Sequence, residues 1–103
     1  MAVHIPLDHD RLDAFCRKWK ITELSLFGSV LRDDFGPKSD VDVLVSFEPD
    51  EQWSLWDHNA MERELEELLG RRVDLLTRRS VESSHNWIRR RSILESAESI
   101  YER

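Results

Sequence analysis

The chain has 103 residues, enough for one domain with one hydrophobic core, and its 40% hydrophobic and 35% charged residues exclude a disordered protein. No apolar run approaches the ~20 residues of a membrane span, and the single Cys16 excludes an intramolecular disulfide, so we expect a cytoplasmic protein with one domain over residues 1–103. The net charge is −6, with 16 acidic against seven basic side chains in residues 1–70, which argues against direct nucleic-acid binding because that needs Lys and Arg on phosphates.

The first predicted element is a helix over about residues 7–19. Asp8 is a suitable N-cap because its side-chain oxygen can accept from free backbone N–H groups of the first turn. Apolar side chains recur with the helical period and predict one buried stripe, formed by Leu12, Phe15, Cys16 and Trp19.

A short strand is predicted next, over residues 22–27, because its leucines alternate with polar residues. Gly28 and Ser29 end this strand as a turn. Residues 30–34 are expected to form a short helical turn, and the turn-forming residues 35–39 are expected to form a loop.

The clearest strand signal covers residues 40–47. Its apolar side chains alternate and are expected to share one face, formed by Val41, Val43, Val45 and Phe47. Asp40 and Asp42 must then point together to the opposite face. A helix is predicted over about residues 55–69, and Gly70 is placed to end it.

The rest of the chain predicts one strand and one helical region. Residues 72–77 alternate and form the strand, with Asp74 on its polar face. The helical region is capped by Ser80, breaks near Asn86 and reaches about Tyr101. This order of elements predicts an α/β (α+β) fold in which helices flank a mixed β-sheet.

The carboxylates of Asp40 and Asp42 point the same way from one strand, where they repel each other unless a cation offsets their charge. Oxygen ligands suit hard divalent cations, so the pair predicts a site for Mg²⁺ or Mn²⁺. Asp74 could supply a third carboxylate to this cluster. Such a cluster suggests two metals that activate an attacking oxygen and stabilise a leaving one at a phosphate.

Gly28 and Ser29 stand where a phosphate site needs close approach of the backbone. Glycine has no side chain to obstruct a ligand, and the Ser29 hydroxyl and the N–H groups of the next helical turn can donate to phosphate oxygens. Each motif is common by itself. Their combination across a strand, a turn, a helical turn and a second strand favours a functional site.

The run Leu26-Phe27-Gly28-Ser29, followed after ten residues by Asp40-Val41-Asp42, resembles the signature of the polymerase β-like nucleotidyltransferase superfamily. Within this superfamily the chain is similar to the minimal nucleotidyltransferases, which are often encoded beside a HEPN-domain toxin as its antitoxin. The resemblance covers the chain from about Leu12 to Leu76.

The resemblance implies a single-domain nucleotidyltransferase fold and a role for each residue of the motif. Gly28 and Ser29 would hold the triphosphate of ATP, and Asp40 and Asp42 would bind the metals. Asp74 would match the third carboxylate, which in this superfamily acts on the acceptor hydroxyl.

In HEPN-paired members the known activity is transfer of AMP from ATP to a tyrosine of the partner ribonuclease, which silences it. We therefore expect a Mg²⁺-dependent adenylyltransferase that releases pyrophosphate and assembles with a HEPN-type toxin. Arg32, three residues after Ser29, would contact phosphate or the loop, or else pair with a neighbouring aspartate. Two other functions stay open: neutralisation of a toxin by binding alone, and transfer of a nucleotide to a small molecule.

Two further groups of residues allow more than one interpretation. Trp53 and Trp56 precede or open the helix that ends at Gly70, and they could form a lid over the base, a partner contact or part of the core. The consecutive Arg89-Arg90-Arg91 points around its helix, which favours a solvated face over a contact with a partner or RNA.

Overall fold

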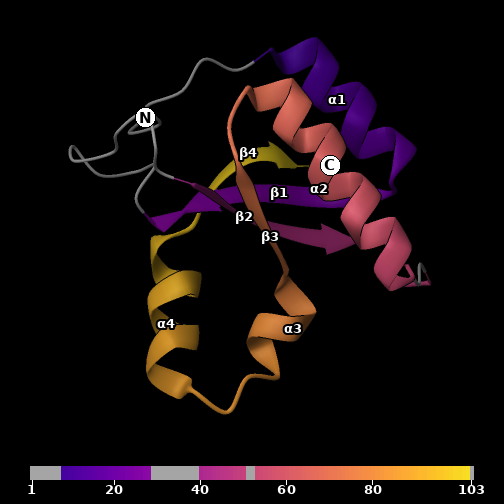
Figure 1. Ribbon diagram of the computed structural model, residues 1–103. Helices are drawn as coiled ribbons and strands as arrows, with labels where there is room; N and C mark the ends of the chain where they lie inside the picture. The colour runs from indigo at the N-terminus through magenta and orange to yellow at the C-terminus, as the bar shows by residue number, and fades with distance from the viewer. Residues whose placement is uncertain (1–7, 29–39, 51–52, 103) are drawn as a thin grey trace.

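The computed structural model describes residues 8–28, 40–50 and 53–102, which form a mixed four-stranded sheet between helices (Figure 1). The strand order is β3-β2-β1-β4, with β1 antiparallel to both neighbours and β2 parallel to β3. The predicted fold class, a mixed sheet flanked by helices, is therefore confirmed. The elements in chain order are α1 (His9–Lys18), β1 (Ile21–Phe27), β2 (Val41–Phe47), α2 (Leu55–Leu69), β3 (Val73–Thr77), α3 (Arg78–Glu82), α4 (Trp87–Ser96) and β4 (Glu98–Glu102).

Side-chain caps define where the first two helices begin. The carboxylate of Asp8 accepts from the backbone N–H of Arg11 at 3.2 Å and caps α1, as its sequence position predicts. Ser54 caps α2 in a reciprocal capping box with Asp57. Gly70 ends α2 in the left-handed conformation with φ +68°, which confirms the predicted stop.

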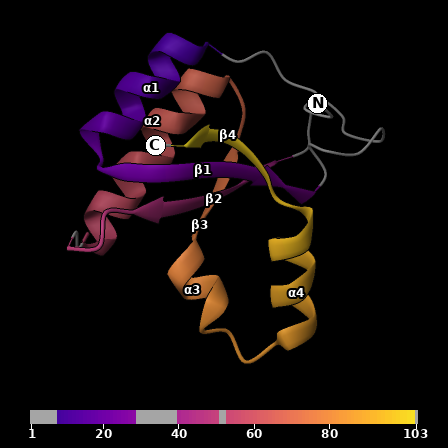
Figure 2. The same ribbon diagram turned by 180° about the vertical axis from the view of Figure 1, so that it is seen from behind.

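Helices α1 and α2 cover one face of the sheet, and α3 and α4 lie on the other, as the front and back views show (Figures 1 and 2). The main core lies between the sheet and the first helix pair. It confirms the predicted stripe of α1 and the predicted alternation of β2 and β3. Its buried members include Leu12, Phe15 and Cys16 from α1, Met61, Leu65 and Leu69 from α2, and Val41, Val43, Val45, Val73 and Leu75 from the strands.

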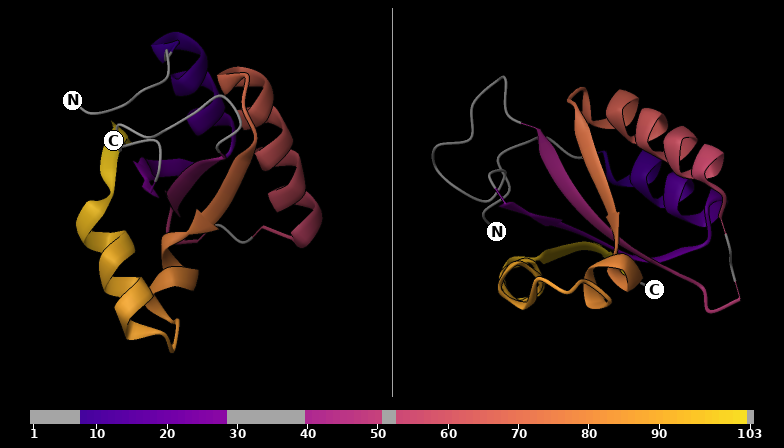
Figure 3. Two further views of the ribbon diagram at one scale, coloured as in Figure 1. Left: turned by 60° about the vertical axis from the view of Figure 1, so that its left-hand side comes forward. Right: turned by 60° about the horizontal axis from the view of Figure 1, so that its bottom comes forward.

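A second, smaller core lies between the sheet and the other helix pair, and this pair lies below the sheet in the right-hand view of Figure 3. It contains Phe27, Leu44, Val81 and Ile93. Leu44 alternates with the valines of β2 that face the main core, so its side chain points to the opposite side. The sheet is therefore covered on both faces, and on this side α3 and α4 pack against apolar residues of the sheet such as Phe27 and Leu44.

The C-terminal segment differs from the sequence prediction. The predicted break near Asn86 is confirmed, because the Asn86 side chain caps α4. The cap of α3, however, is Thr77, whose hydroxyl accepts from the backbone N–H of Ser80. The prediction that the helical region reaches Tyr101 is wrong, since α4 ends at Ser96 and the chain continues as a strand.

Strand β4 forms because the outer edge of β1 offers unpaired backbone groups that need hydrogen-bond partners. Ile100 and Tyr101 also pack against the main core from this strand. Neither effect is visible in a five-residue sequence that lacks a strong alternation.

Two further results concern the rest of the chain. The predicted helical turn over residues 30–34 and the loop over residues 35–39 lie outside the described residues. Within residues 8–28, 40–50 and 53–102, no helix has the length and apolar character needed to cross a membrane.

Candidate active site

Two aspartates far apart in the sequence lie side by side on the parallel strands. Asp42 is the second residue of β2 and Asp74 is the second residue of β3, and the two are directly paired in the strand register. Paired positions on neighbouring strands are about 4.8 Å apart and point to the same face. Asp42 is half-buried, whereas Asp74 is exposed. The fold thus brings together two of the three predicted carboxylates.

Asp40, the third predicted carboxylate, directly precedes β2 and is exposed. Within the described part of the chain, no three side chains of His, Cys, Asp and Glu gather closely enough to hold a metal ion. The metal site formed by three carboxylates therefore stays a prediction.

Gly28 connects the predicted phosphate turn with the carboxylates. It follows the last residue of β1, Phe27, which is the register partner of Asp42. Gly28 has φ +75°, and a Cβ placed on it would overlap the Oδ2 atom of Asp42. The Asp42 carboxylate thus packs directly against the Gly28 backbone, and a residue with a side chain would displace it.

The donors brought together here fit a hard divalent cation. Asp42 and Asp74 offer only carboxylate oxygens, and Mg²⁺ is often held by one or two carboxylates together with phosphate oxygens of a substrate. The Asp42 carboxylate occupies the space that a side chain at Gly28 would fill, so a cation bound by Asp42 would lie beside the Gly28 backbone. Ser29 and Arg32, the other predicted phosphate ligands, lie outside the described residues.

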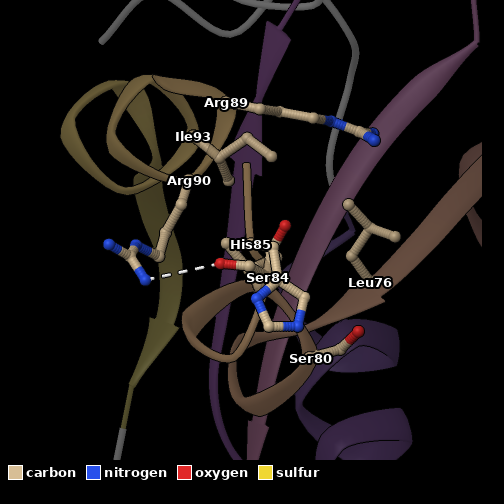
Figure 4. Close-up of a pocket in the computed structure, with 8 residues that line it drawn as sticks. Leu76, Ser80, Ser84, His85, Arg89, Arg90 and Ile93 are labelled. Carbon is tan, nitrogen blue, oxygen red and sulfur yellow. Dashed lines mark hydrogen bonds between the residues drawn. The ribbon is translucent and has the colours of Figure 1, made fainter. Parts of the chain in front are cut away.

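A cavity between α3 and α4 lies on the same face of the sheet as the paired aspartates (Figure 4). Arg89 and Arg90 of α4 contribute to its wall. This cavity was not predicted from the sequence, in which the Arg89-Arg90-Arg91 run is its one visible signal. A run of arginines is most often a solvated helix face, so the sequence could not show that two of these arginines line a cavity.

The two ambiguous tryptophans prove to have different environments. Trp53 packs edge-on against Trp19 and Phe47, with ring centroids 5.2 and 6.3 Å apart, and so belongs to the main core. Trp56 lies on the first turn of α2 and is 82% exposed.

Comparison with known proteins gives a family and several relatives. Residues 11–100 match the sequence profile of the family described as "Nucleotidyltransferase domain". A Methanocaldococcus jannaschii protein named "Putative protein adenylyltransferase MJ1379" is 35% identical over 78 residues, which cover 76% of this chain and 75% of that protein. Protein adenylyltransferase MntA of Thermococcus cleftensis is 42% identical over 66 residues, which cover 64% of this chain and 65% of that protein.

Two solved structures share the fold at 17% sequence identity. A toxin–antitoxin structure with AMP-PNP matches with a TM-score of 0.70 over 94% of this chain and 75% of that chain. A complex of the tri-AMPylated Shewanella oneidensis HEPN toxin with its MNT antitoxin matches with a TM-score of 0.60, over 91% and 69% of the two chains. The profile match spans most of the sequence and includes the Gly28 turn and all three aspartates, so the chain belongs to the nucleotidyltransferase domain family.

Proposed function

We propose that this protein is an adenylyltransferase that moves AMP from ATP to a tyrosine hydroxyl of a HEPN-type toxin and thereby acts as its antitoxin. The observation that carries the proposal is the pairing of Asp42 with Asp74 beside the Gly28 backbone. The names of the relatives support it, since two of them are described as protein adenylyltransferases. The two structural matches, one with AMP-PNP and one with an AMPylated HEPN toxin, agree with it.

Three carboxylates would hold the metal in this proposal. Asp42 and Asp74 would bind Mg²⁺, or Mn²⁺, from adjacent strands, and Asp40 would join them from the residue before β2. A bound divalent cation would offset negative charge on the α-phosphate and on the departing pyrophosphate.

The remaining roles belong to the chain's own groups. The backbone of Gly28 and the side chains of Ser29 and Arg32 would bind the outer phosphates of ATP and orient them for departure. Asp74 would accept the proton of the tyrosine hydroxyl. The hydroxyl oxygen then forms a bond to the α-phosphorus while the bond from that phosphorus to the bridging oxygen breaks, and pyrophosphate leaves.

The acceptor lies outside this chain, so the proposal requires assembly with the toxin. A toxin tyrosine would have to reach the face of the sheet that carries Asp42 and Asp74. We also propose that the pair acts in the cytoplasm, where the free thiol of the buried Cys16 would stay reduced.

The test is intact-mass spectrometry of the HEPN-type toxin from the same genome after incubation with this protein, ATP and Mg²⁺. We expect the toxin mass to rise by one or more AMP units, located on a tyrosine peptide. The Asp40→Asn/Asp42→Asn double variant should remain folded, as judged by circular dichroism, and should leave the toxin mass unchanged.

Three results would contradict the proposal. An unmodified toxin that is nevertheless silenced in a tight complex would favour neutralisation by binding alone. Release of pyrophosphate without a change in toxin mass would point to a small-molecule acceptor. Full activity of the double variant would remove Asp40 and Asp42 from the site.

A further inference from the structure

The cavity between α3 and α4 has about 350 Å³ of free volume, which lies within the range of small-molecule sites. Its apolar lining consists of Leu76 from β3, Val81 from α3 and Ile93 from α4. Val81 and Ile93 also belong to the smaller core, so this part of the wall is held by packing rather than by a loop. The cavity therefore has a preformed apolar floor.

This floor continues directly from the paired carboxylates. Leu76 follows Asp74 by two residues on β3, and Leu44 of the smaller core follows Asp42 by two residues on β2. Side chains two positions apart on a strand share a face, and their Cα atoms are about 7 Å apart. A ligand with its phosphate at the aspartates can thus extend along the strands onto the floor of the cavity.

The polar wall of the cavity is cationic and rich in hydroxyl groups. It is formed by Ser80, Ser84, His85, Arg89 and Arg90. None of the described residues that line it is acidic. The apolar floor and this polar wall together favour a ligand that combines an apolar or aromatic part with hydrogen-bonding edges. The positive charge of the wall favours a ligand that also carries negative charge.

The three consecutive arginines of α4 have different surroundings. The guanidinium of Arg90 donates to the backbone carbonyls of Glu82 and Ser84, and Arg91 forms an ion pair with Glu95 at 2.9 Å. Arg89 instead extends from α4 across the cavity toward the sheet (Figure 4). Within the described ranges its guanidinium has no hydrogen-bond or ion-pair partner, so its planar group is available to a ligand.

We propose that this cavity binds the nucleoside part of ATP, with the base on the apolar floor and the Arg89 guanidinium against the base. The inference rests on the proposed function, because it assumes that the phosphates of the same ATP lie at Asp42 and Gly28. Arginine stacks well on aromatic rings through its flat, weakly hydrated guanidinium. Hydroxyl and imidazole groups such as those of Ser80 and His85 can bond the edges of the base and the ribose.

The lining favours the nucleoside over the phosphates as occupant. A triphosphate gains nothing from three apolar side chains, whereas a base gains both burial and dispersion contacts from them. In the proposed function the phosphates already have a place, at the cation held by Asp42 beside the Gly28 backbone.

Calorimetric titration with Mg²⁺ present tests the inference, using ATP and inorganic tripolyphosphate as separate ligands. We expect Arg89→Ala to weaken ATP binding by about ten-fold and to leave tripolyphosphate binding unchanged. Arg91→Ala is the matched control on the same helix and should change neither affinity. Ser80→Trp, which fills the cavity, should also weaken only ATP binding, whereas Ser83→Trp, which lies outside the lining, should not.

Several outcomes would overturn the inference. One is an equal loss of ATP and tripolyphosphate binding in Arg89→Ala, since Arg89 would then bind phosphate. Another is unchanged ATP affinity in both Arg89→Ala and Ser80→Trp, and a third is the absence of ATP binding by the wild-type chain. If a toxin tyrosine peptide, rather than adenosine, perturbs the amide resonances of the cavity residues, the occupant is the acceptor and the inference is wrong.

The proposed function can fail independently. ATP binding that depends on Arg89, without any AMP appearing on the toxin, would support the nucleoside site and contradict the proposed AMP transfer. AMP transfer with an unchanged KM for ATP in Arg89→Ala and Ser80→Trp would support the reaction and contradict the nucleoside site.

Discussion

Asp42 on β2 and Asp74 on β3 are direct partners in a parallel strand register, so their carboxylates project side by side from one face of the sheet. Both positions belong to strands whose neighbouring residues, such as Val41 and Val73, are buried in the main core. Regular, packed elements hold side chains more accurately than loops do. The pair is thus preorganised by the sheet, and Gly28 is placed against one member of it.

The first prediction concerns the repulsion between these carboxylates. Asp74→Asn should raise the free energy of unfolding at low salt by up to about 1 kcal/mol, because like charges on paired strand positions destabilise a sheet. It should also remove most of the stabilisation that Mg²⁺ gives the wild-type chain, since a cation that binds only the folded state stabilises it. Urea denaturation with and without Mg²⁺ measures both effects.

Asp50→Asn is the control for this experiment, because Asp50 is an exposed aspartate in the turn beyond the far end of β2. It should neither raise stability nor change the response to Mg²⁺. If Mg²⁺ stabilises the Asp74 variant, the Asp50 variant and the wild type equally, the cation binds elsewhere.

The second prediction compares two glycines. Gly28 and Gly70 both have positive φ, at +75° and +68°, so alanine at either position should cost about 1–2 kcal/mol of stability. Only Gly28→Ala also places a Cβ against the Asp42 carboxylate, whereas the space around Gly70 is open. We expect AMP transfer to fall by about 100-fold in Gly28→Ala and to persist in Gly70→Ala.

Unfolding curves give the loss of stability in each variant. Transfer rates measured at a temperature where both variants are folded show whether Gly28→Ala also disturbs the site. Equal activity of the two would show that the contact between Gly28 and Asp42 does not position the carboxylate.

The third prediction separates the two tryptophans. Trp53→Ala should lower the free energy of unfolding by about 2–3 kcal/mol, because it removes a half-buried ring packed against Trp19 and Phe47. Trp56→Ala should change it by less than about 0.5 kcal/mol, since Trp56 is 82% exposed. Thermal unfolding followed by circular dichroism gives both values.

A conservative change sharpens this test. The Nε1 atom of Trp53 is buried and has no hydrogen-bond partner among the described residues. Trp53→Phe removes this unsatisfied donor and keeps a ring, so it should be much less destabilising than Trp53→Ala. A loss as large as that of alanine would mean that the N–H group is bonded in solution.

The fourth prediction concerns β4. Ile100→Ala should destabilise the protein by about 1–2 kcal/mol, because Ile100 packs from the edge strand against the main core. Ser99→Ala, at the exposed neighbouring position, should be nearly neutral. Hydrogen exchange should in addition show protected amides in Glu98–Glu102. Rapid exchange throughout this segment would contradict the strand.

The sequence by itself determined the features that depend on near neighbours in the chain. The apolar period of α1, the alternation of β2 and the stop at Gly70 are local patterns, and the structure has each of them. The motif that joins Gly28 to Asp40 and Asp42 indicated the family, because its residues and spacing are specific as a set. The roles of Ser29 and Arg32 stay predictions, since both lie outside the described residues.

Only the tertiary structure decided which distant residues meet. The register between Asp42 and Asp74 follows from how β3 docks on β2 after the long α2 connection, and no spacing rule sets that pairing. Strand β4 forms because β1 has an open edge, although the sequence of the β4 segment predicted that the preceding helix continues. The cavity under Arg89 requires α3 and α4 to pack on one face of the sheet. In all three cases the deciding interactions join segments that are remote in sequence, so local propensity and periodicity carry no information about them.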